Sequence, residues 1–439
     1  MEIVGCRDGR GDGEYRELGR PFATLVAMEA PFLNLAAVTA SLWIFAPASI
    51  AQAAAEPAVV DVAVPADSGA LAPNLARSTR GVLLTWLAPL AKAAGSKPKR
   101  KSFALRMARL EGHAWTKPVT IRSGADFFAN WADLPSVVEA KGGALYAHWL
   151  QFSGIGTYDY DVMLARSVDG KAWEQLGRLH TDKSRAEHGF VSLVPDGVGV
   201  RGFWLDGGHL KKRGTMALMT RLVGATAEGS APEEVLDADV CTCCQTGAVQ
   251  TSTGPLLVYR DHAKHELRDI SFVRRTKDGW TAPKLVHRDG WRIPACPVNG
   301  PAVARTERLL AVAWYSGASA SGHVAVAFSN DDGKSFAKPI VVDDAKPVGR
   351  VAIACLDATA IVCWLGRSDN RAVLRLRRVT PDGSLGKPLE LATLRGSRSA
   401  GFPRLVRVGD ELVVVWREVA DGARLRSAIV PLAAVGAAR

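Results

Sequence analysis

Carboxylate, tyrosine and arginine side chains recur in this 439-residue sequence just before or just after short apolar segments. Carboxylates suit proton transfer, and arginines suit bidentate binding of a carboxylate. The candidates for chemistry are Asp133, Glu187, Tyr160 (with Tyr158 as its alternative) and Asp261. The candidates for holding an anionic group are Arg260, Arg268, Arg350, Arg404, His188 and Asn299. Together they predict a polar site for an acidic small ligand.

A second group of reactive side chains consists of cysteines. Cys241, Cys243 and Cys244 lie close together, and Cys296 follows 52 residues after Cys244. With His188 they offer thiolate and imidazole ligands that suit zinc or copper. In an extended strand Cys243 and Cys244 would point to opposite faces, so we favour a disulfide from one of them to Cys296. Metal binding remains the alternative, and no other cofactor is expected.

These residues must be positioned by a repeated β-structure. Seven short apolar segments each end in an aromatic residue, and these aromatics are spaced by 63, 55, 55, 55, 50 and 52 positions. They are Trp86, Trp149, Trp204, Tyr259, Trp314, Trp364 and Trp416. A near-constant period with apolar, β-branched content predicts one buried strand per repeat. An aromatic-x-x-Pro pattern, as in residues 280–283, predicts a later edge strand. The expected fold is an all-β propeller of seven four-stranded blades.

One propeller domain is expected over residues 57–432, followed by a tail, 433–439. Residues 59–64 alternate between apolar and other residues over most of their length, which is typical of a strand. The last repeat, 398–432, has room for only three strands. We therefore expect residues 57–66 to close the ring as the outer strand of the seventh blade.

The amino-terminal segment indicates export. Residues 1–56 hold a charged preface, a mostly apolar run and a stretch of small residues, as in a secretory signal. We expect a periplasmic or secreted protein with no stable membrane anchor after processing. The net charge of +11 favours anionic partners, but no nucleic-acid-binding motif accompanies it. A monomer is expected.

Propeller topology predicts where the polar candidates lie. The loop into the innermost strand and the turn after the second strand lie on one face of each blade. The acidic, arginine and cysteine candidates fall at these places in successive repeats. Convergent polar groups on one rim favour a ligand site. Arg260 and Arg268 flank one such turn, and strand alternation predicts that both guanidinium groups point toward the channel mouth.

Turn sequences add a family resemblance. Residues 329–336 match the Asp-box pattern S-x-D-x-G-x-x-(F/W), and residues 167–173 match a form shortened by one residue. Over residues 72–432 the chain resembles the sialidase-like Asp-box propellers. More narrowly, it resembles an uncharacterised group of exported bacterial sialidase-like proteins. The stretches that carry this narrower resemblance are 130–133, 187–190, 243–246, 259–261, 268–270 and 296–301.

The resemblance implies a chemistry. Sialidases bind a carboxylate through three arginines, use a tyrosine nucleophile activated by a glutamate, and protonate the leaving group from an aspartate. It therefore implies Tyr160 as nucleophile, Glu187 as its base and Asp133 as acid/base, in an exo-sialidase-like glycoside hydrolase acting on an acidic sugar. Six blades, as in sialidases, is the alternative to seven. A non-catalytic propeller that binds an anionic ligand or a metal is the alternative function.

Overall fold

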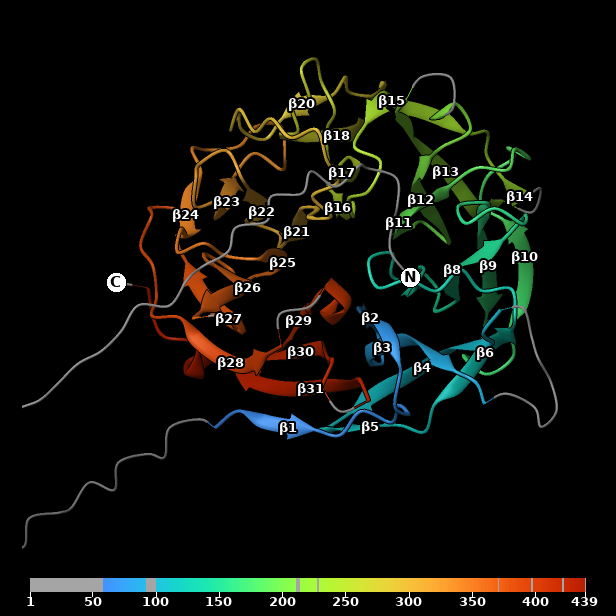
Figure 1. Cartoon of the computed structure of the whole chain (residues 1–439), viewed down its shortest axis with the longest axis horizontal. Helices are drawn as coiled ribbons and strands as arrows, with labels where there is room; N and C mark the ends of the chain where they lie inside the picture. Colours follow the sequence, from blue (N-terminus) through green and yellow to red (C-terminus); the bar gives the residue numbers. More distant parts are fainter. Residues whose placement is uncertain are drawn as a thin grey trace, which may run out of the picture.

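The computed structural model describes residues 58–91, 100–210, 214–226, 229–369, 371–395, 398–420 and 422–438. The predicted signal segment, 1–56, lies outside these ranges. Within them the chain forms seven antiparallel sheets arranged in a ring (Figure 1). The seven-bladed all-β propeller is therefore confirmed, and the six-bladed alternative is wrong. None of the helices in the described ranges is long and apolar enough to cross a membrane.

The first four blades follow the chain in order from the inner to the outer strand. Blade one consists of β2 (Leu71–Ser78), β3 (Gly81–Pro89), β4 (Phe103–Glu111) and β6 (Val119–Gly124). Blade two consists of β7 (Ser136–Glu139), β8 (Leu145–Phe152), β9 (Tyr160–Ser167) and β10 (Glu174–Arg178). Blade three consists of β11 (His188–Asp196), β12 (Gly199–Asp206), β13 (Met216–Thr226) and β15 (Glu234–Val240). Blade four consists of β16 (Gly247–Thr251), β17 (Gly254–Arg260), β18 (Ile270–Thr276) and β20 (Lys284–Leu285).

The remaining blades repeat this order, except that the last takes its outer strand from the beginning of the domain. Blade five consists of β21 (Ala302–Arg305), β22 (Leu310–Ser316), β23 (His323–Ser329) and β24 (Ile340–Asp343). Blade six consists of β25 (Gly349–Cys355), β26 (Ala360–Ser368), β27 (Arg371–Val379) and β28 (Leu389–Leu394). Blade seven consists of β29 (Arg404–Val408), β30 (Glu411–Glu418), β31 (Arg424–Pro431) and β1 (Val60–Val62). The short elements are β5 (Ala114–Trp115), β14 (Gly229–Ser230), β19 (Gly279–Trp280) and the 3-10 helices η1 (Arg398–Ala400) and η2 (Leu432–Ala434).

The ring is closed by a strand from the opposite end of the domain. β1 pairs antiparallel with β31, with Val60 opposite Ile429. The Ser427 hydroxyl donates to the carbonyl of Val62 at 2.8 Å across this pairing. Residues 57–66 were expected to supply this strand, and three of them, Val60–Val62, do so.

The core lies between neighbouring blades. Trp86, Trp149, Trp204, Trp314 and Trp364 are fully buried, which explains the spacing of the aromatic anchors. Trp314 of blade five packs in one cluster with Phe272 of blade four, and Trp204 of blade three packs with Leu164 of blade two. Each anchor thus joins its own blade to the preceding one. Truncating such a side chain to alanine typically costs about 3–5 kcal/mol.

The polar turn between β23 and β24, the third and fourth strands of blade five, is held together by local hydrogen bonds. Asp331 Oδ1 accepts hydrogen bonds from the backbone N–H groups of Lys334 and Ser335, both at 3.0 Å. The Ser329 hydroxyl accepts the N–H of Gly333, whose φ of 79° favours glycine. These are the local contacts that the sequence of the turn predicts.

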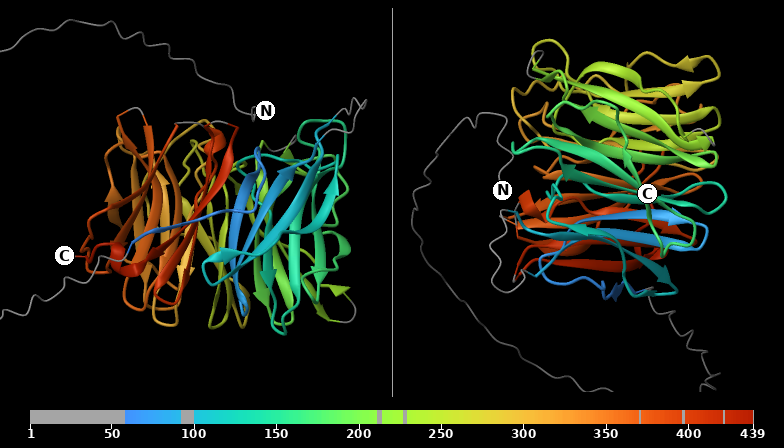
Figure 2. Two further views of the ribbon diagram at one scale, coloured as in Figure 1. Left: turned by 90° about the horizontal axis from the view of Figure 1, so that it is seen from below. Right: turned by 90° about the vertical axis from the view of Figure 1, so that its right-hand side faces the viewer.

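Strands of all blades run between two opposite faces of the ring (Figure 2). The loops into β11, β16 and β21 and the turn after β17 lie at one end of the strands, because consecutive strands are antiparallel. This face, the inner-loop face, carries the pocket described next.

Candidate functional site

A pocket lined by reactive side chains lies on the inner-loop face, between blades two, three and four. Its volume is about 800 Å³. The side chains that matter for chemistry in its lining are Tyr158, Asp159, Arg185, Glu187, Cys243, His262, Arg268 and Cys296. We call this the Glu187 pocket. It combines one carboxyl group close to a tyrosine with basic groups that suit an anionic ligand.

Glu187 is held at this pocket by Tyr160. The Tyr160 hydroxyl donates a hydrogen bond of 2.5 Å to Oε1 of Glu187. Tyr160 opens β9, and its backbone forms an isolated parallel bridge with Glu187, just before β11 begins. The Tyr160 ring is only 1% exposed and stacks on Phe128 with 3.9 Å between ring centroids. Of the two candidate tyrosines, Tyr160 is thus the one bonded to Glu187, but only Glu187 of this pair lines the pocket.

Burial controls the protonation of this pair. Burial, with the nearby charge of Asp133, raises the pKa of Glu187 to about 7, although the hydrogen bond from Tyr160 acts in the opposite direction. Burial and the charges of Glu187 and Asp133 raise the pKa of Tyr160 well above 10.0. At neutral pH Tyr160 is therefore protonated, and Glu187 exchanges a proton readily.

Asp133 lies beside the pair but does not line the pocket. Its Oδ2 accepts the backbone N–H of Phe190, a residue with a φ of 53° at the irregular start of β11. Burial raises the pKa of Asp133 to about 7, against the effect of backbone hydrogen bonds from Phe190 and Val191. Asn130 in turn accepts the N–H of Asp133 at 2.8 Å. The predicted acid/base role of Asp133 is therefore corrected: it shapes the loop that carries Glu187.

Arg260 is a structural residue, contrary to the prediction. It is 2% exposed, and its Nη2 donates to the carbonyl oxygens of Asn299 at 2.7 Å and Tyr315 at 2.8 Å. Its Nη1 donates to the carbonyl of Arg268 at 2.5 Å. Its guanidinium also lies 4.6 Å from the ring centroid of Trp291. The strand alternation argument failed because the inner-loop backbone presents carbonyl groups that this guanidinium satisfies.

Asn299 and Arg350 continue the same inner-loop scaffold and do not bind a ligand in the pocket. Asn299 Nδ2 donates to the carbonyl of Val348 at 3.1 Å, and its Oδ1 accepts the N–H of Arg350 at 2.7 Å. Arg350 Nη1 donates to the carbonyl of Gly401 at 2.9 Å, and its guanidinium lies 4.8 Å from the ring centroid of Trp131. Neither side chain lines the Glu187 pocket, because both join successive blades, so the structure does not support their predicted substrate-binding roles.

Arg404 and Arg268 occupy different places. Arg404 lines a separate cavity of about 220 Å³ between the inner strands, and burial lowers its pKa to about 10. Arg268 does line the Glu187 pocket, and its Nη2 donates to Oε2 of Glu266 at 2.6 Å. Of the four predicted arginines, Arg268 alone reaches this pocket, so the expected clamp is not assembled. Arg185, which the sequence argument missed, is the second arginine in the lining.

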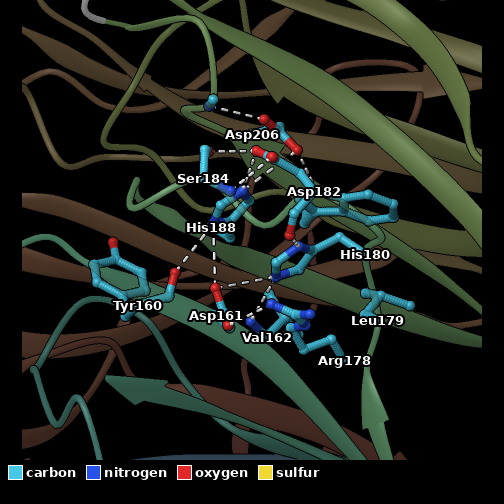
Figure 3. A network of polar contacts seen from close by, with 12 residues as sticks. Tyr160, Asp161, Val162, Arg178, Leu179, His180, Asp182, Ser184, His188 and Asp206 are labelled. Atoms are coloured by element: carbon cyan, nitrogen blue, oxygen red, sulfur yellow. Dashed lines mark hydrogen bonds and ion pairs between the residues drawn. The ribbon is translucent and has the colours of Figure 1, made fainter. Parts of the chain in front are cut away.

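His188 belongs to a buried polar network beneath the pocket (Figure 3). Its two ring nitrogens lie 3.1 Å from the carbonyl of Tyr160 and 3.1 Å from Oδ2 of Asp182. Its ring stacks on His180 with 3.9 Å between centroids. His188 is 0% exposed and does not line the Glu187 pocket, so the structure does not support its predicted contact with substrate. The network instead fixes the start of β11 against β9, where Glu187 and Tyr160 meet.

Asp261 is also turned away from the pocket. Its Oδ2 accepts the Ser271 hydroxyl at 2.7 Å, and burial raises its pKa. It does not line the Glu187 pocket. The predicted catalytic role is therefore not supported, because the turn after β17 directs this carboxyl to its own blade.

The cysteine cluster differs from both sequence-based arguments. Cys241, Cys243 and Cys244 lie in a loop between β15 and β16, so strand alternation does not apply and their sulfurs converge. Sγ of Cys241 lies 3.9 Å from that of Cys243 and 3.6 Å from that of Cys244. A disulfide needs about 2.05 Å. No disulfide joins Cys243 or Cys244 to Cys296, so the predicted disulfide is not formed.

A second pocket adjoins the first. Its volume is about 640 Å³, and it shares Thr157 and Tyr158 with the Glu187 pocket. Its other notable lining residues are Arg100, Lys101, Phe128, Asn130, Trp131 and Arg417. We call it the aromatic pocket. Tyr158, weighed above as the alternative to Tyr160, thus stands where the two pockets join.

Comparisons with known proteins address the fold. No protein-family model and no curated protein matches the sequence. A solved ulvan lyase of polysaccharide lyase family 25, bound to -[GlcA(1-4)Rha3S]-, is similar with a TM-score of 0.57 and 12% identity over 85% of this chain and 96% of that chain. A second structure of an ulvan lyase of this family gives a TM-score of 0.55 at 12% identity, with the same coverage of 85% and 96%.

A mutant α-L-arabinofuranosidase from Fusarium graminearum, in complex with an iminosugar inhibitor, is more distant. Its TM-score is 0.49 at 14% identity, over 86% of this chain and 98% of that chain. No argument rests on a likeness of this strength. At such low identities the ulvan lyase structures show the fold alone. The chain has the seven-bladed propeller fold expected from its repeats, and its activity must be argued from the site itself.

Proposed function

We propose that this propeller is a carbohydrate-active enzyme that hydrolyses a bond in an acidic saccharide, with Glu187 as the catalytic base. The observation that carries the proposal is the 2.5 Å hydrogen bond from Tyr160 to Glu187 at the wall of an 800 Å³ pocket. A carboxyl group with a pKa of about 7 is suited to proton transfer at neutral pH.

The charge of the pocket supports an acidic substrate. Arg185, Arg268 and His262 line the same pocket as Glu187. Arginine binds a carboxylate or sulfate with two N–H groups at once. The adjoining aromatic pocket adds Arg100 and Lys101 beside aromatic rings, which suits a further sugar unit of the same polymer.

Each side chain then has a definite task. In the proposed reaction the carboxylate of Glu187 removes a proton from an attacking water, and the hydroxyl of Tyr158, at the junction of the two pockets, donates a proton to the leaving oxygen. The proton held by Glu187 then returns through water to Tyr158. Tyr160 is a positioning residue, because it is buried and its hydroxyl is bonded to Glu187. The finer exo-sialidase reading, in which Tyr160 is the nucleophile, is a variant of this proposal.

Product release tests the proposal. Purified protein is assayed on a fluorogenic sialoside, on a fluorogenic glucuronide and on acidic polysaccharides, with neutral polysaccharides for comparison. We expect release from an acidic substrate and a loss of at least about a hundredfold in kcat for Glu187→Gln. Glu390→Gln, on the outer strand of blade six, is the matched control and should keep full activity.

Two results would contradict the proposal. One is no release from any acidic substrate above a heat-denatured control. The other is a Glu187→Gln variant that keeps the native rate. Binding of an acidic oligosaccharide without turnover, measured by calorimetry, would instead favour the non-catalytic alternative. The basic lining of the aromatic pocket is the observation that favours that alternative.

A further inference from the structure

Three buried sulfur atoms meet in the loop between β15 and β16. Cys241, Cys243 and Cys244 are 1%, 3% and 2% exposed, and their Sγ atoms all lie within 4.8 Å of one another. Buried cysteines elsewhere in the described chain, Cys355 and Cys363, sit in strands as ordinary core residues. A loop that bends three thiols toward one point requires a different explanation.

The spacing of the sulfurs matches a metal centre. A Zn–S bond is about 2.3 Å long, so two thiolates on a tetrahedral zinc ion are about 3.8 Å apart. The two measured separations from Cys241, 3.9 Å and 3.6 Å, bracket this value. Two of the three sulfur separations therefore already match zinc coordination, and the third is no longer than 4.8 Å.

Two arginines lie close to the sulfur atoms. Arg268 lines the same pocket as Cys243. Arg260 donates to the carbonyl of Asn299, whose own N–H lies 3.5 Å from Sγ of Cys244. Three thiolates and one Zn²⁺ carry a net charge of −1, which a neighbouring guanidinium balances inside the protein. Arg260 thus has a second reason to be buried at this place.

Other groups of potential ligands are less suitable. Asp161, His180 and His188 approach one another, as do Asp182, His188 and Asp206. Both ring nitrogens of His188 already lie at hydrogen-bonding distance from Tyr160 and Asp182, however. A metal there would have to replace these contacts, whereas the cysteine sulfurs contact mainly one another.

We propose that Cys241, Cys243 and Cys244 bind one zinc ion, whose fourth coordination position opens to the Glu187 pocket. Cys243 lines that pocket, with Cys296 beside it, so a water molecule or a ligand atom reaches the ion from there. Three protein ligands and one open position are typical of zinc sites that act on a bound molecule. This goes beyond the hydrolase proposal, since it requires no activity of Glu187.

Metal reconstitution tests the site. The full-length protein, purified under reducing conditions and freed of metal, is titrated with Co²⁺ and then with Zn²⁺. We expect one Co²⁺ per chain with thiolate-to-cobalt charge-transfer absorption, abolished when Zn²⁺ displaces it. Cys241→Ser, Cys243→Ser and Cys244→Ser should each weaken zinc binding by at least about tenfold. Cys363→Ser, in blade six, should bind zinc as the native chain does.

Folding must be controlled separately. Circular dichroism shows whether each serine variant is folded. Where a variant is not folded, an alkylation experiment on the native chain replaces its zinc titration. In that experiment zinc should shield three cysteines from alkylation, and mass spectrometry identifies which three. The proposal is overturned if the reduced protein takes up no stoichiometric Co²⁺ or Zn²⁺, or if it binds copper(I) alone. It is also overturned if the native, air-exposed protein lacks metal and two of these cysteines have formed a disulfide.

Discussion

The hydroxyl of Tyr160 donates a 2.5 Å hydrogen bond to Oε1 of Glu187, across the junction of blades two and three. Tyr160 opens a third strand, and Glu187 immediately precedes an inner strand. Their contact is therefore a product of the propeller topology, which brings the beginnings of β9 and β11 together on the inner-loop face. The first prediction concerns this bond.

Tyr160→Phe should move the pH profile of hydrolysis. The hydrogen bond from Tyr160 lowers the pKa of Glu187, so its loss should raise that pKa above about 7. We expect the acid limb of kcat/KM to move to higher pH by about one unit. A change of one pKa unit corresponds to about 1.4 kcal/mol, which is the energy of a modest hydrogen bond. Tyr259→Phe is the matched control, because Tyr259 also donates to a carboxylate, Asp237, at 2.6 Å. Equal profiles for both variants would contradict the positioning role of Tyr160.

The pH dependence of the proposed hydrolysis should follow the ionisation of Glu187. A base acts only when ionised, and the pKa of Glu187 is about 7. The groups that set this value besides burial are Tyr160, Asp133 and Cys296. kcat/KM should therefore fall tenfold for each pH unit below about 7 and level off above it. A rate that instead falls as the pH rises above 7 would identify Glu187 as an acid.

Asp133→Asn should remove a pH dependence of stability. Burial raises the pKa of Asp133 to about 7 in the folded state, above its ordinary value of 3.8, so the folded state holds the proton more tightly than the unfolded state. Stability from this group is thus complete below about pH 4 and is lost as the pH rises to about 7. The asparagine keeps an oxygen for the N–H of Phe190 and carries no charge.

The measurement is the melting temperature at pH 5 and pH 8. Native protein should lose stability between these values, by up to about 1.4 kcal/mol per pH unit from this group. Asp133→Asn should lose less. If the variant melts lower than native protein by the same amount at both pH values, Asp133 is ionised in the folded state and the prediction is wrong.

Alanine substitutions of Arg260 and Arg268 should have different effects: the first should lower stability, and the second should weaken ligand binding. Arg260→Ala leaves buried carbonyl acceptors of Asn299, Tyr315 and Arg268 without a donor, at about 1–3 kcal/mol each, so a clearly lower melting temperature is expected. Arg268→Ala should melt near the native temperature but weaken binding of an acidic oligosaccharide by about 1.5–3 kcal/mol. Calorimetry and thermal unfolding of both variants check this, and the reverse pattern would restore Arg260 as a ligand-binding residue.

The spacing of the aromatic anchors and the residues of the turns were enough to predict the ring, its seven blades and the face that carries the candidate site. They depend on local patterns: an aromatic anchor such as Trp314 repeats because each blade needs the same buried contact. Glu187 and Tyr160 were both among the candidates, since one precedes an inner strand and the other follows a second strand on the same face, but the sequence did not show that they contact each other.

The orientation of long side chains was not predictable in this way. Arg260 and Arg350 turn to backbone carbonyls that belong to other loops, and a sequence does not show which carbonyls lack a partner. The converging sulfurs of Cys241, Cys243 and Cys244 were missed because an extended backbone was assumed where the chain forms a loop. Arg185 carried no local signal beyond its place two residues before Glu187.

The pairing of Val60 with Ile429 has a consequence for how the molecule folds. The two partners lie near opposite ends of the domain, so the entropy lost in joining them cannot be recovered until almost the whole chain has been synthesised. Ring closure should therefore come late, after the sheets of single blades have formed from neighbouring strands. Until then β31 presents an unpaired edge, the part of this fold most open to pairing with another chain.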